Sequence, residues 1–201
     1  MATTATPASA TEKTLHWSVA AAVAVLAASG AILYVPALSE LVGQRFWVRT
    51  AHLAAAAALA LIPPAAALMR WPEVRALERD LSRWSTADSA WFVRPWQVLR
   101  GERVELPPRA GRFNGGQRLF AALVATALAV LLATGIPMYW WSWFAAETVA
   151  RSRDVHVLTT LALVALVAGH VYLGIERVGS PHGGIASGGA SERAVRPDPD
   201  R

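Results

Sequence analysis

Four apolar segments without a formal charge constrain this chain more than any other feature. Each is at least 20 residues long; they are Leu15–Ser39, Thr50–Met69, Leu119–Ala146 and Val155–Ile175. A helix needs about 20 apolar residues to cross the hydrocarbon core of a bilayer. Helices in a soluble bundle would need a polar face toward water, which these segments lack. The sequence therefore predicts an all-α integral membrane protein with a bundle of four transmembrane helices.

Composition agrees with a membrane protein and narrows its chemistry. Of the 201 residues, 54% are hydrophobic and only 16% are charged, which is unusual for a soluble domain. There is no cysteine, so disulfides, iron–sulfur clusters and covalently attached c-type haem are excluded on this chain. Any bound metal must use histidine, carboxylate or carbonyl ligands.

The basic residues predict how the helices are oriented. The net charge is +5, but the arginines flank the apolar segments, so they indicate membrane topology rather than nucleic-acid binding. The connection between the second and third segments contains ten of them: Arg70, Arg75, Arg79, Arg83, Arg94, Arg100, Arg103, Arg109, Arg112 and Arg118. Each of the other two connections contains two. The positive-inside rule then places the long loop and both termini on the cytoplasmic side of the membrane.

The chain divides into a membrane domain between two tails. Residues 1–13 lack the pattern of a secretory signal and, like residues 179–201, are expected to be flexible. The membrane domain covers residues 14–178, and its cytoplasmic loop covers 70–118. The loop begins with helical spacing of Val74, Leu77 and Leu81, which predicts an amphipathic helix at the membrane surface. The transmembrane spans are expected at about 15–36, 50–69, 119–139 and 155–175.

Four of the five histidines lie in the apolar segments. An imidazole at membrane depth is unfavourable without a partner, so each is a candidate functional residue. A single one would be explained by a hydrogen bond between helices, but four require a joint explanation. The four are His16, His52, His156 and His170; the fifth, His182, follows the last segment and is interpreted as a surface residue.

The depths of the histidines predict two pairs. His156 and His170 are 14 residues apart, which places them about 21 Å apart along one helix and within about 40° of one face. The orientation puts His52 and His156 near the outer surface, and His16 and His170 near the inner one. Two imidazoles on a planar macrocycle are the ligands of b-type haem, whereas tetrahedral zinc needs more ligands per site. Two stacked haem b sites are therefore predicted.

Small residues near the predicted sites leave room for a large planar group. Gly30 follows His16 by 14 residues, Ala66 follows His52 by the same interval, and Thr134-Gly135 and Gly169 offer similar space. Each could also be a helix-packing contact. Two haems across a membrane would form a path for electrons, and no hydrolase triad, phosphate loop or nucleotide site is present. The donor is then expected to be another subunit, and the acceptor a lipid-soluble quinone.

Several motifs give the chain a family resemblance. They are L-H-W at 15–17, S-G at 29–30, the histidine that opens the second span, V-L-R-G at 98–101, G-R-F-N-G-G-Q at 111–117, T-G at 134–135, and the 14-residue spacing of His156 and His170. With these motifs the chain resembles the gamma subunit of membrane-bound formate dehydrogenase, a di-haem cytochrome b with four transmembrane helices. The G-R-F-N-G-G-Q stretch is the most specific of them.

The resemblance implies roles for individual residues. All four histidines would be axial ligands of haem iron, in the pairs His16 with His170 and His52 with His156. A quinone, either menaquinone or ubiquinone, would bind near His170, Asn114 and Gly116. Asn114 can donate a hydrogen bond to a quinone carbonyl, and Gly116 permits close backbone approach. The alternative role of Asn114 is the N-cap of the third span.

The resemblance also implies the partners. They would be an iron–sulfur beta subunit and a molybdenum- or tungsten-pterin alpha subunit, in a higher oligomer of the complex within the lipid of a bacterial inner membrane. Formate would be oxidised on the alpha subunit, and this chain would transfer electrons to quinone in anaerobic respiration. The same architecture would also suit a hydrogenase or a thiosulfate or polysulfide reductase. An alternative of another class is a haem-free membrane anchor, or a transporter of protons or metal ions.

Overall fold

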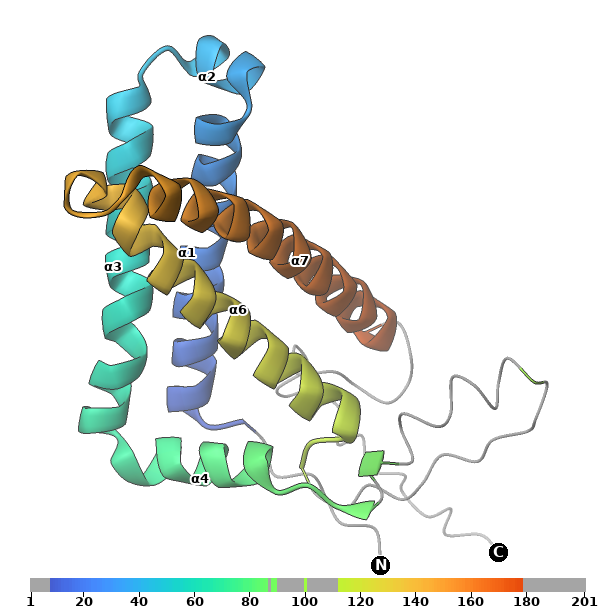
Figure 1. Ribbon diagram of the computed structural model, residues 1–201. Helices are drawn as coiled ribbons and strands as arrows, with labels where there is room; N and C mark the ends of the chain where they lie inside the picture. Colours follow the sequence, from blue (N-terminus) through green and yellow to red (C-terminus); the bar gives the residue numbers. More distant parts are fainter. Residues whose placement is uncertain (1–7, 87, 90–99, 101–111, 179–201) are drawn as a thin grey trace, which may run out of the picture. The chain divides into compact units, whose positions relative to one another are not determined.

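A computed structural model of the chain describes residues 8–86, 88, 89, 100 and 112–178 (Figure 1). The regular elements in this described part are all helical. They are α1 (Ala10–Tyr34), α2 (Pro36–Val42), α3 (Arg45–Met69), α4 (Trp71–Ser82), α6 (Gly115–Tyr139), the 3-10 helix η1 (Trp141–Trp143) and α7 (Ala146–Val178). The chain divides into two compact units, residues 1–166 and 167–201, with the division inside α7. The contacts described below lie within the first unit.

Four of these helices are long and apolar enough to cross a membrane: α1, α3, α6 and α7. They correspond to the four predicted spans, although all four begin earlier in the sequence than expected. The first span is shorter at its end than the apolar segment, because Pro36 cannot donate a backbone hydrogen bond and holds Val35 in an extended conformation. Pro36 then opens the short helix α2, which ends at Gly43 with a left-handed φ of 66°.

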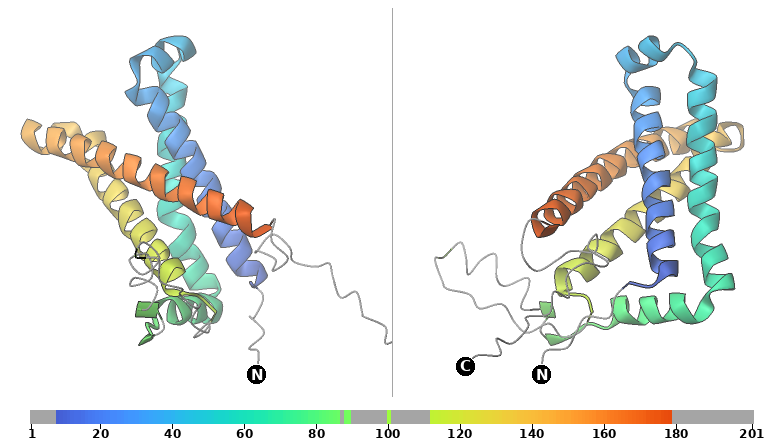
Figure 2. Two further views of the ribbon diagram at one scale, coloured as in Figure 1. Left: turned by 90° about the vertical axis from the view of Figure 1, so that its right-hand side faces the viewer. Right: turned by 180° about the vertical axis from the view of Figure 1, so that it is seen from behind.

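Helices α1 and α3 form a closely packed antiparallel pair, which lies side by side in the right-hand view of Figure 2. Their buried apolar side chains are small or of moderate size, namely Ala22 of α1 and Ala55 and Leu59 of α3. Small side chains let two helix backbones approach closely in a membrane, where packing replaces the hydrophobic effect as the attraction between helices. The alanine-rich sequence of α3 thus positions its histidine against α1.

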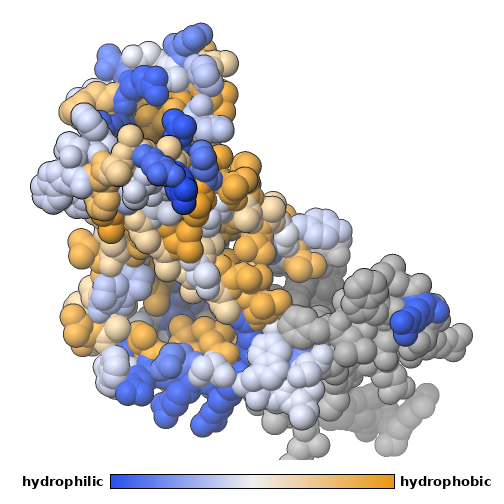
Figure 3. All heavy atoms as spheres, in the orientation of Figure 1, coloured by the Kyte–Doolittle hydropathy of each residue, from blue (hydrophilic) through white to orange (hydrophobic). Residues whose placement is uncertain are grey.

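Most large apolar side chains point away from the protein. At most 11% of the residues in any of the four apolar windows are buried, and Leu68 of α3 is 86% exposed. Figure 3 shows hydrophobic residues over the long helices and hydrophilic ones gathered over α4 and around α2. In α4, Arg75, Glu78 and Arg79 are exposed while Val74 and Leu77 are half-buried, so the helix expected at the start of the long loop is present and amphipathic.

A partly buried ion pair joins the start of α1 to the entry of α6. Arg112 donates two hydrogen bonds to the carboxylate of Glu12, one of them at 2.7 Å, and lies 3.9 Å from Asp80 of α4. These bonds raise the pKa of Arg112 above its usual value. Near the start of α3, the Arg49 guanidinium lies 5.7 Å from the ring centre of Tyr139 of α6, which is a cation–π contact. Together these contacts order the ends of the helices in the first unit.

The start of α6 is built from a capping box and a very close backbone contact. Asn114 is the N-cap, and its side chain accepts from the Gln117 N–H at 2.9 Å while Gln117 accepts from the Asn114 N–H at 3.0 Å. Next to it, a Cβ at Gly115 would lie 2.6 Å from the carbonyl oxygen of Asp88. Only glycine therefore fits between α6 and the segment before it.

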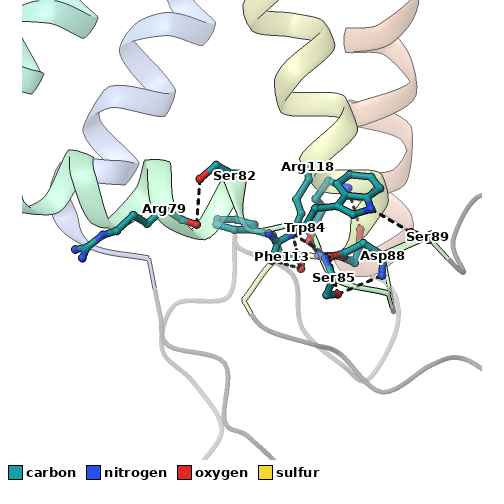
Figure 4. Close-up of polar contacts among 10 residues, drawn as sticks. Arg79, Ser82, Trp84, Ser85, Asp88, Ser89, Phe113 and Arg118 are labelled. Carbon is teal, nitrogen blue, oxygen red and sulfur yellow. Dashed lines mark hydrogen bonds and ion pairs between the residues drawn. The ribbon is translucent and has the colours of Figure 1, made fainter.

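Asp88 and Arg118 hold this segment in place (Figure 4). Asp88 accepts from the Ser85 N–H and hydroxyl, both at 2.8 Å, and lies 3.7 Å from Nε of Arg118. Arg118 in turn donates to the Phe113 carbonyl at 3.3 Å. Both charged residues are buried, Asp88 with 3% and Arg118 with 6% of its surface exposed. A buried charge is tolerated only when paired and hydrogen-bonded, which explains this arrangement.

We predict that Gly115→Ala destabilises the protein, because its methyl group would force Asp88 and its carbonyl away from α6. Overpacking of this kind typically costs about 1–3 kcal/mol. Thermal unfolding of the purified protein in detergent should show a lower midpoint than the wild type. The matched control is Gly174→Ala in α7, where a Cβ meets no atom within 4 Å and the alanine favours the helix. Equal midpoints for the two variants would contradict the close contact at Gly115.

Candidate functional site

His52 of α3 and His156 of α7 lie side by side in the first unit. Their ring centres are 6.5 Å apart and their planes are inclined by 51°. Both rings are half-buried, and each lies two turns or more from the start of its helix. These are the two residues predicted to share the outer site.

Each of the two rings is hydrogen-bonded by a hydroxyl group from the preceding long helix. Nδ1 of His52 lies 2.9 Å from Oγ of Ser29 in α1. Nδ1 of His156 lies 2.9 Å from Oγ1 of Thr134 in α6. The two imidazoles thus have the same nitrogen bonded, to the same kind of group, at the same distance.

The protons of these hydrogen bonds can be assigned from the backbone contacts of the hydroxyls. A hydroxyl has one hydrogen to donate. Ser29 lies 2.5 Å from the Val25 carbonyl oxygen, and Thr134 lies 2.7 Å from the Val130 carbonyl oxygen, so each hydroxyl donates to its own helix. Its oxygen must then accept a hydrogen bond from the imidazole N–H, so each neutral ring carries its proton on Nδ1. The lone pair of Nε2 is left for a ligand.

Two glycines leave space next to the rings. A Cβ at Gly30 would lie 3.5 Å from Cε1 of His52, and one at Gly135 would lie 3.9 Å from Cε1 of His156. These are ordinary contact distances, so the imidazoles themselves do not require glycine. Glycine inside a helix lowers helix stability by about 1 kcal/mol relative to alanine. The space that it leaves beside each ring offsets this loss.

The two rings fit the axial ligands of one haem iron. Two metal–nitrogen bonds of about 2 Å each, plus about 1 Å from each nitrogen to its ring centre, put two such rings about 6 Å apart, close to the observed 6.5 Å. In the part of the chain that the structure describes, no group of three or more His, Cys, Asp or Glu residues is placed to hold a metal ion. Two neutral imidazoles therefore suit a macrocycle that supplies the remaining donors itself.

The other predicted pair stays a prediction. His16 lies on α1 one turn after Glu12, at the opposite end of the helix from Ser29 and Gly30, with its ring edge-on to Trp17 at 5.4 Å. His170 lies in α7 within the second unit, residues 167–201. Within the first unit, most of the length of α1 therefore lies between His16 and the His52–His156 pair.

Among the residues predicted to bind quinone, Asn114 has a structural role as the N-cap of α6. This is the alternative role that the sequence allowed, and it occupies the amide oxygen, which leaves the NH₂ group as a donor. Gly116 lies in the first turn of α6. His182, the tails 1–7 and 179–201, and most of the V-L-R-G segment lie outside the described residues.

Sequence reasoning missed the hydroxyl groups of Ser29 and Thr134. The S-G and T-G pairs were interpreted as space beside a ring, and the residue before each glycine received no separate role. The available signal was the order of residues, because in both cases a hydroxyl residue and a glycine precede a histidine by a similar interval, 23 residues from Ser29 to His52 and 22 from Thr134 to His156. The neighbouring Gly115 admits the close approach of the Asp88 backbone, and the role of Gly116 stays a prediction.

Comparison with known families shows which family the chain belongs to. The profile of the family described as prokaryotic cytochrome b561 matches residues 8–176, which include α1, α3, α6, most of α7 and all four histidines. No curated protein sequence matches the chain. The extent of the match shows the family, and the helices long enough to span a membrane agree with it. This chain belongs to the prokaryotic cytochrome b561 family and is a membrane cytochrome of the b type, which binds haem b and takes part in electron transfer.

Proposed function

We propose that this cytochrome is the di-haem subunit through which a respiratory formate dehydrogenase delivers electrons to quinone. His52 and His156 would hold the outer haem, and His16 and His170 the inner one. Each haem b, when bound, supplies an iron that is reversibly oxidised and reduced by one electron. The residues of the chain hold that iron, exclude water from it and fix its depth in the membrane.

One observation supports the proposal most directly, namely the paired rings of His52 and His156 with both Nδ1 atoms bonded to hydroxyls. That arrangement leaves the Nε2 lone pair of each ring for a ligand, on two rings whose centres are 6.5 Å apart. A proton relay would need rings free to exchange their protons, and here each Nδ1 proton is held by an acceptor that is itself anchored to a helix. Family membership likewise favours a cytochrome over a haem-free anchor or transporter.

The direction of electron flow in the proposal follows from charge. The arginine-rich connection that contains α4 is proposed to be cytoplasmic, with the termini on the same side. The ion pair of Glu12 with Arg112 supports this, since it keeps the start of α1 beside the entry to α6. Electrons would then enter at the outer end from an iron–sulfur subunit, and quinone would take up protons at the inner end.

The identity of the donor rests on the sequence motifs. A hydrogenase or a thiosulfate or polysulfide reductase could use the same cytochrome architecture. Affinity purification of the chain from its native membranes under mild detergent tests this point. Co-purification of an iron–sulfur subunit with a molybdenum- or tungsten-pterin subunit, and reduction of the cytochrome by formate, would support the proposal. Reduction by dihydrogen but not by formate would replace it with the hydrogenase.

We predict that each histidine variant loses one particular haem. His52→Ala and His156→Ala should both lose the outer haem, because each removes one of its two axial ligands, while His16→Ala and His170→Ala should both lose the inner one. Haem content per chain should fall from two to one in all four variants. Redox titration of the reduced-minus-oxidised spectrum identifies which haem remains. A crossed pattern, in which His52→Ala and His170→Ala lose the same haem, would refute the pairing.

We predict that Asn114→Ser slows reoxidation of the reduced haems by quinone while α6 stays folded. Serine is a good N-cap, so it can replace the capping bond to Gln117, but it lacks the NH₂ group proposed to bind a quinone carbonyl. A loss of about 1.4–3 kcal/mol of binding, typical of a deleted hydrogen bond that leaves a buried partner, corresponds to roughly a tenfold to hundredfold weaker apparent affinity. Stopped-flow reoxidation at varied quinone concentration measures it.

The matched control is Asn114→Ala, which removes both the cap and the NH₂ group. It should slow reoxidation as much as Asn114→Ser and also lower the unfolding midpoint in detergent. Wild-type reoxidation kinetics in Asn114→Ser would limit Asn114 to its capping role.

A further inference from the structure

We infer that Ser29 and Thr134 are positioning residues of the outer metal site, which fix the tautomer and the ring plane of His52 and His156 and thereby set the redox potential there. The inference rests on the proposed ligation of one haem iron by these two histidines. It adds two residues that touch neither the iron nor the macrocycle in their proposed role. They act through the imidazoles.

The two hydroxyls are themselves rigidly held. Each donates to the carbonyl four residues earlier in its own helix, Ser29 to Val25 at 2.5 Å and Thr134 to Val130 at 2.7 Å, with a second carbonyl at 3.3 Å in both cases. Ser29 is also buried, with 6% of its surface exposed. Because the hydroxyl hydrogen is committed to the helix, its oxygen can only accept from the ring. The arrangement therefore selects one tautomer.

The same device occurs twice in the chain. In one helix pair a Ser-Gly step on α1 faces His52 on α3, and in the other a Thr-Gly step on α6 faces His156 on α7. In both, the hydroxyl bonds Nδ1 and the following glycine lies against Cε1 of the same ring. Two unrelated packing contacts would have no reason to share the atom, the distance and the order of residues. A common requirement, that Nε2 of each ring points to one shared centre, explains the repetition.

The chemistry of the bond gives the direction of its effect. An imidazole that donates from Nδ1 to an oxygen becomes a more basic ligand through Nε2. The hydroxyl is a stronger acceptor than a free one, because its own hydrogen is already given to a carbonyl and the bonds polarise one another. A more basic ligand stabilises the oxidised iron, so the bond lowers the reduction potential. Its removal should raise that potential.

The bond also holds the ring plane. A ring bonded at Nδ1 cannot rotate about its Cβ–Cγ bond without breaking that contact, and the two planes are held 51° apart. The angle between two axial imidazole planes affects the electron paramagnetic resonance g values of a ferric haem. Release of one ring should therefore change the g values of the outer haem only.

The test uses the purified full-length cytochrome with its haems bound. Ser29→Ala and Thr134→Val each remove a hydroxyl with little change in volume. The conservative variants Ser29→Thr and Thr134→Ser keep a hydroxyl at the same position. We expect the first two variants to keep both haems but to shift the ferric–ferrous equilibrium of one haem about tenfold toward ferrous iron, the lower end of the effect that loss of such an outer contact has on metal affinity or activity. For one electron this is a positive shift of about 59 mV. The conservative variants, which keep the hydroxyl, should have the wild-type potential and g values.

The matched control is Thr50→Ala. Thr50 is exposed and donates to the Phe46 carbonyl four residues earlier at 3.0 Å, so it makes the same backbone bond as Ser29 without bonding a histidine ring. Its potentials and g values should equal those of the wild type. A shift as large as that of Ser29→Ala would mean that loss of any helix hydroxyl near the site disturbs the haem, and would overturn the inference.

Two further outcomes separate the inference from the proposed function. If His52→Ala loses one haem but Ser29→Ala and Thr134→Val leave potentials and g values unchanged, the ligation stands and the positioning role is wrong. If His52→Ala keeps both haems with unchanged spectra, the proposed ligation itself fails, and the inference fails with it.

Discussion

The structure depends on the need to satisfy imidazole nitrogens inside a membrane. Water is absent there, so an unbonded N–H is expensive and a histidine needs a defined partner. His52 and His156 meet this need with hydroxyls that are bonded to their own helices. Once Nδ1 is satisfied in this way, Nε2 is the nitrogen left for chemistry. The position of the ring, its protonation and its ligand atom follow from a single contact.

That contact also explains the helix pairs. Ser29 can reach His52 only because α1 and α3 approach closely, and they do so through Ala22 and Ala55. The alanine-rich sequence of α3 would make a poor hydrophobic core. It is well suited, however, to bring a hydroxyl on one helix close to a ring on the next. The glycine after each hydroxyl keeps the adjacent space open.

The sequence predicted the fold class well and the site in part. Charge-free segments of about 20 residues have few alternatives to a membrane helix, so the number of spans was readable, and the match to a cytochrome family agrees with the b-type chemistry predicted from the histidines. Helix ends were less predictable, because apolar length does not show that Pro36 starts a new helix or that α7 begins at Ala146. Whether a hydroxyl such as that of Ser29 bonds a histidine depends on which helices are in contact. The contact at Gly115 likewise depends on the position of the Asp88 backbone beside α6. Neither can be predicted from the periodicity of one segment.

The ion pair of Glu12 with Arg112 has a consequence for the order in which the protein is made. Its two residues are 100 positions apart, so during synthesis α1 and α3 can enter the bilayer long before Arg112 leaves the ribosome. Glu12 must wait at the membrane surface, with its charge solvated, while the first helix pair forms from contacts closer in sequence. The later arrival of Arg112 then closes a loop of 100 residues and joins the start of α6 to a helix pair already assembled. The ion pair can therefore form only in the second stage of membrane insertion, when α6 is ready to enter the bilayer.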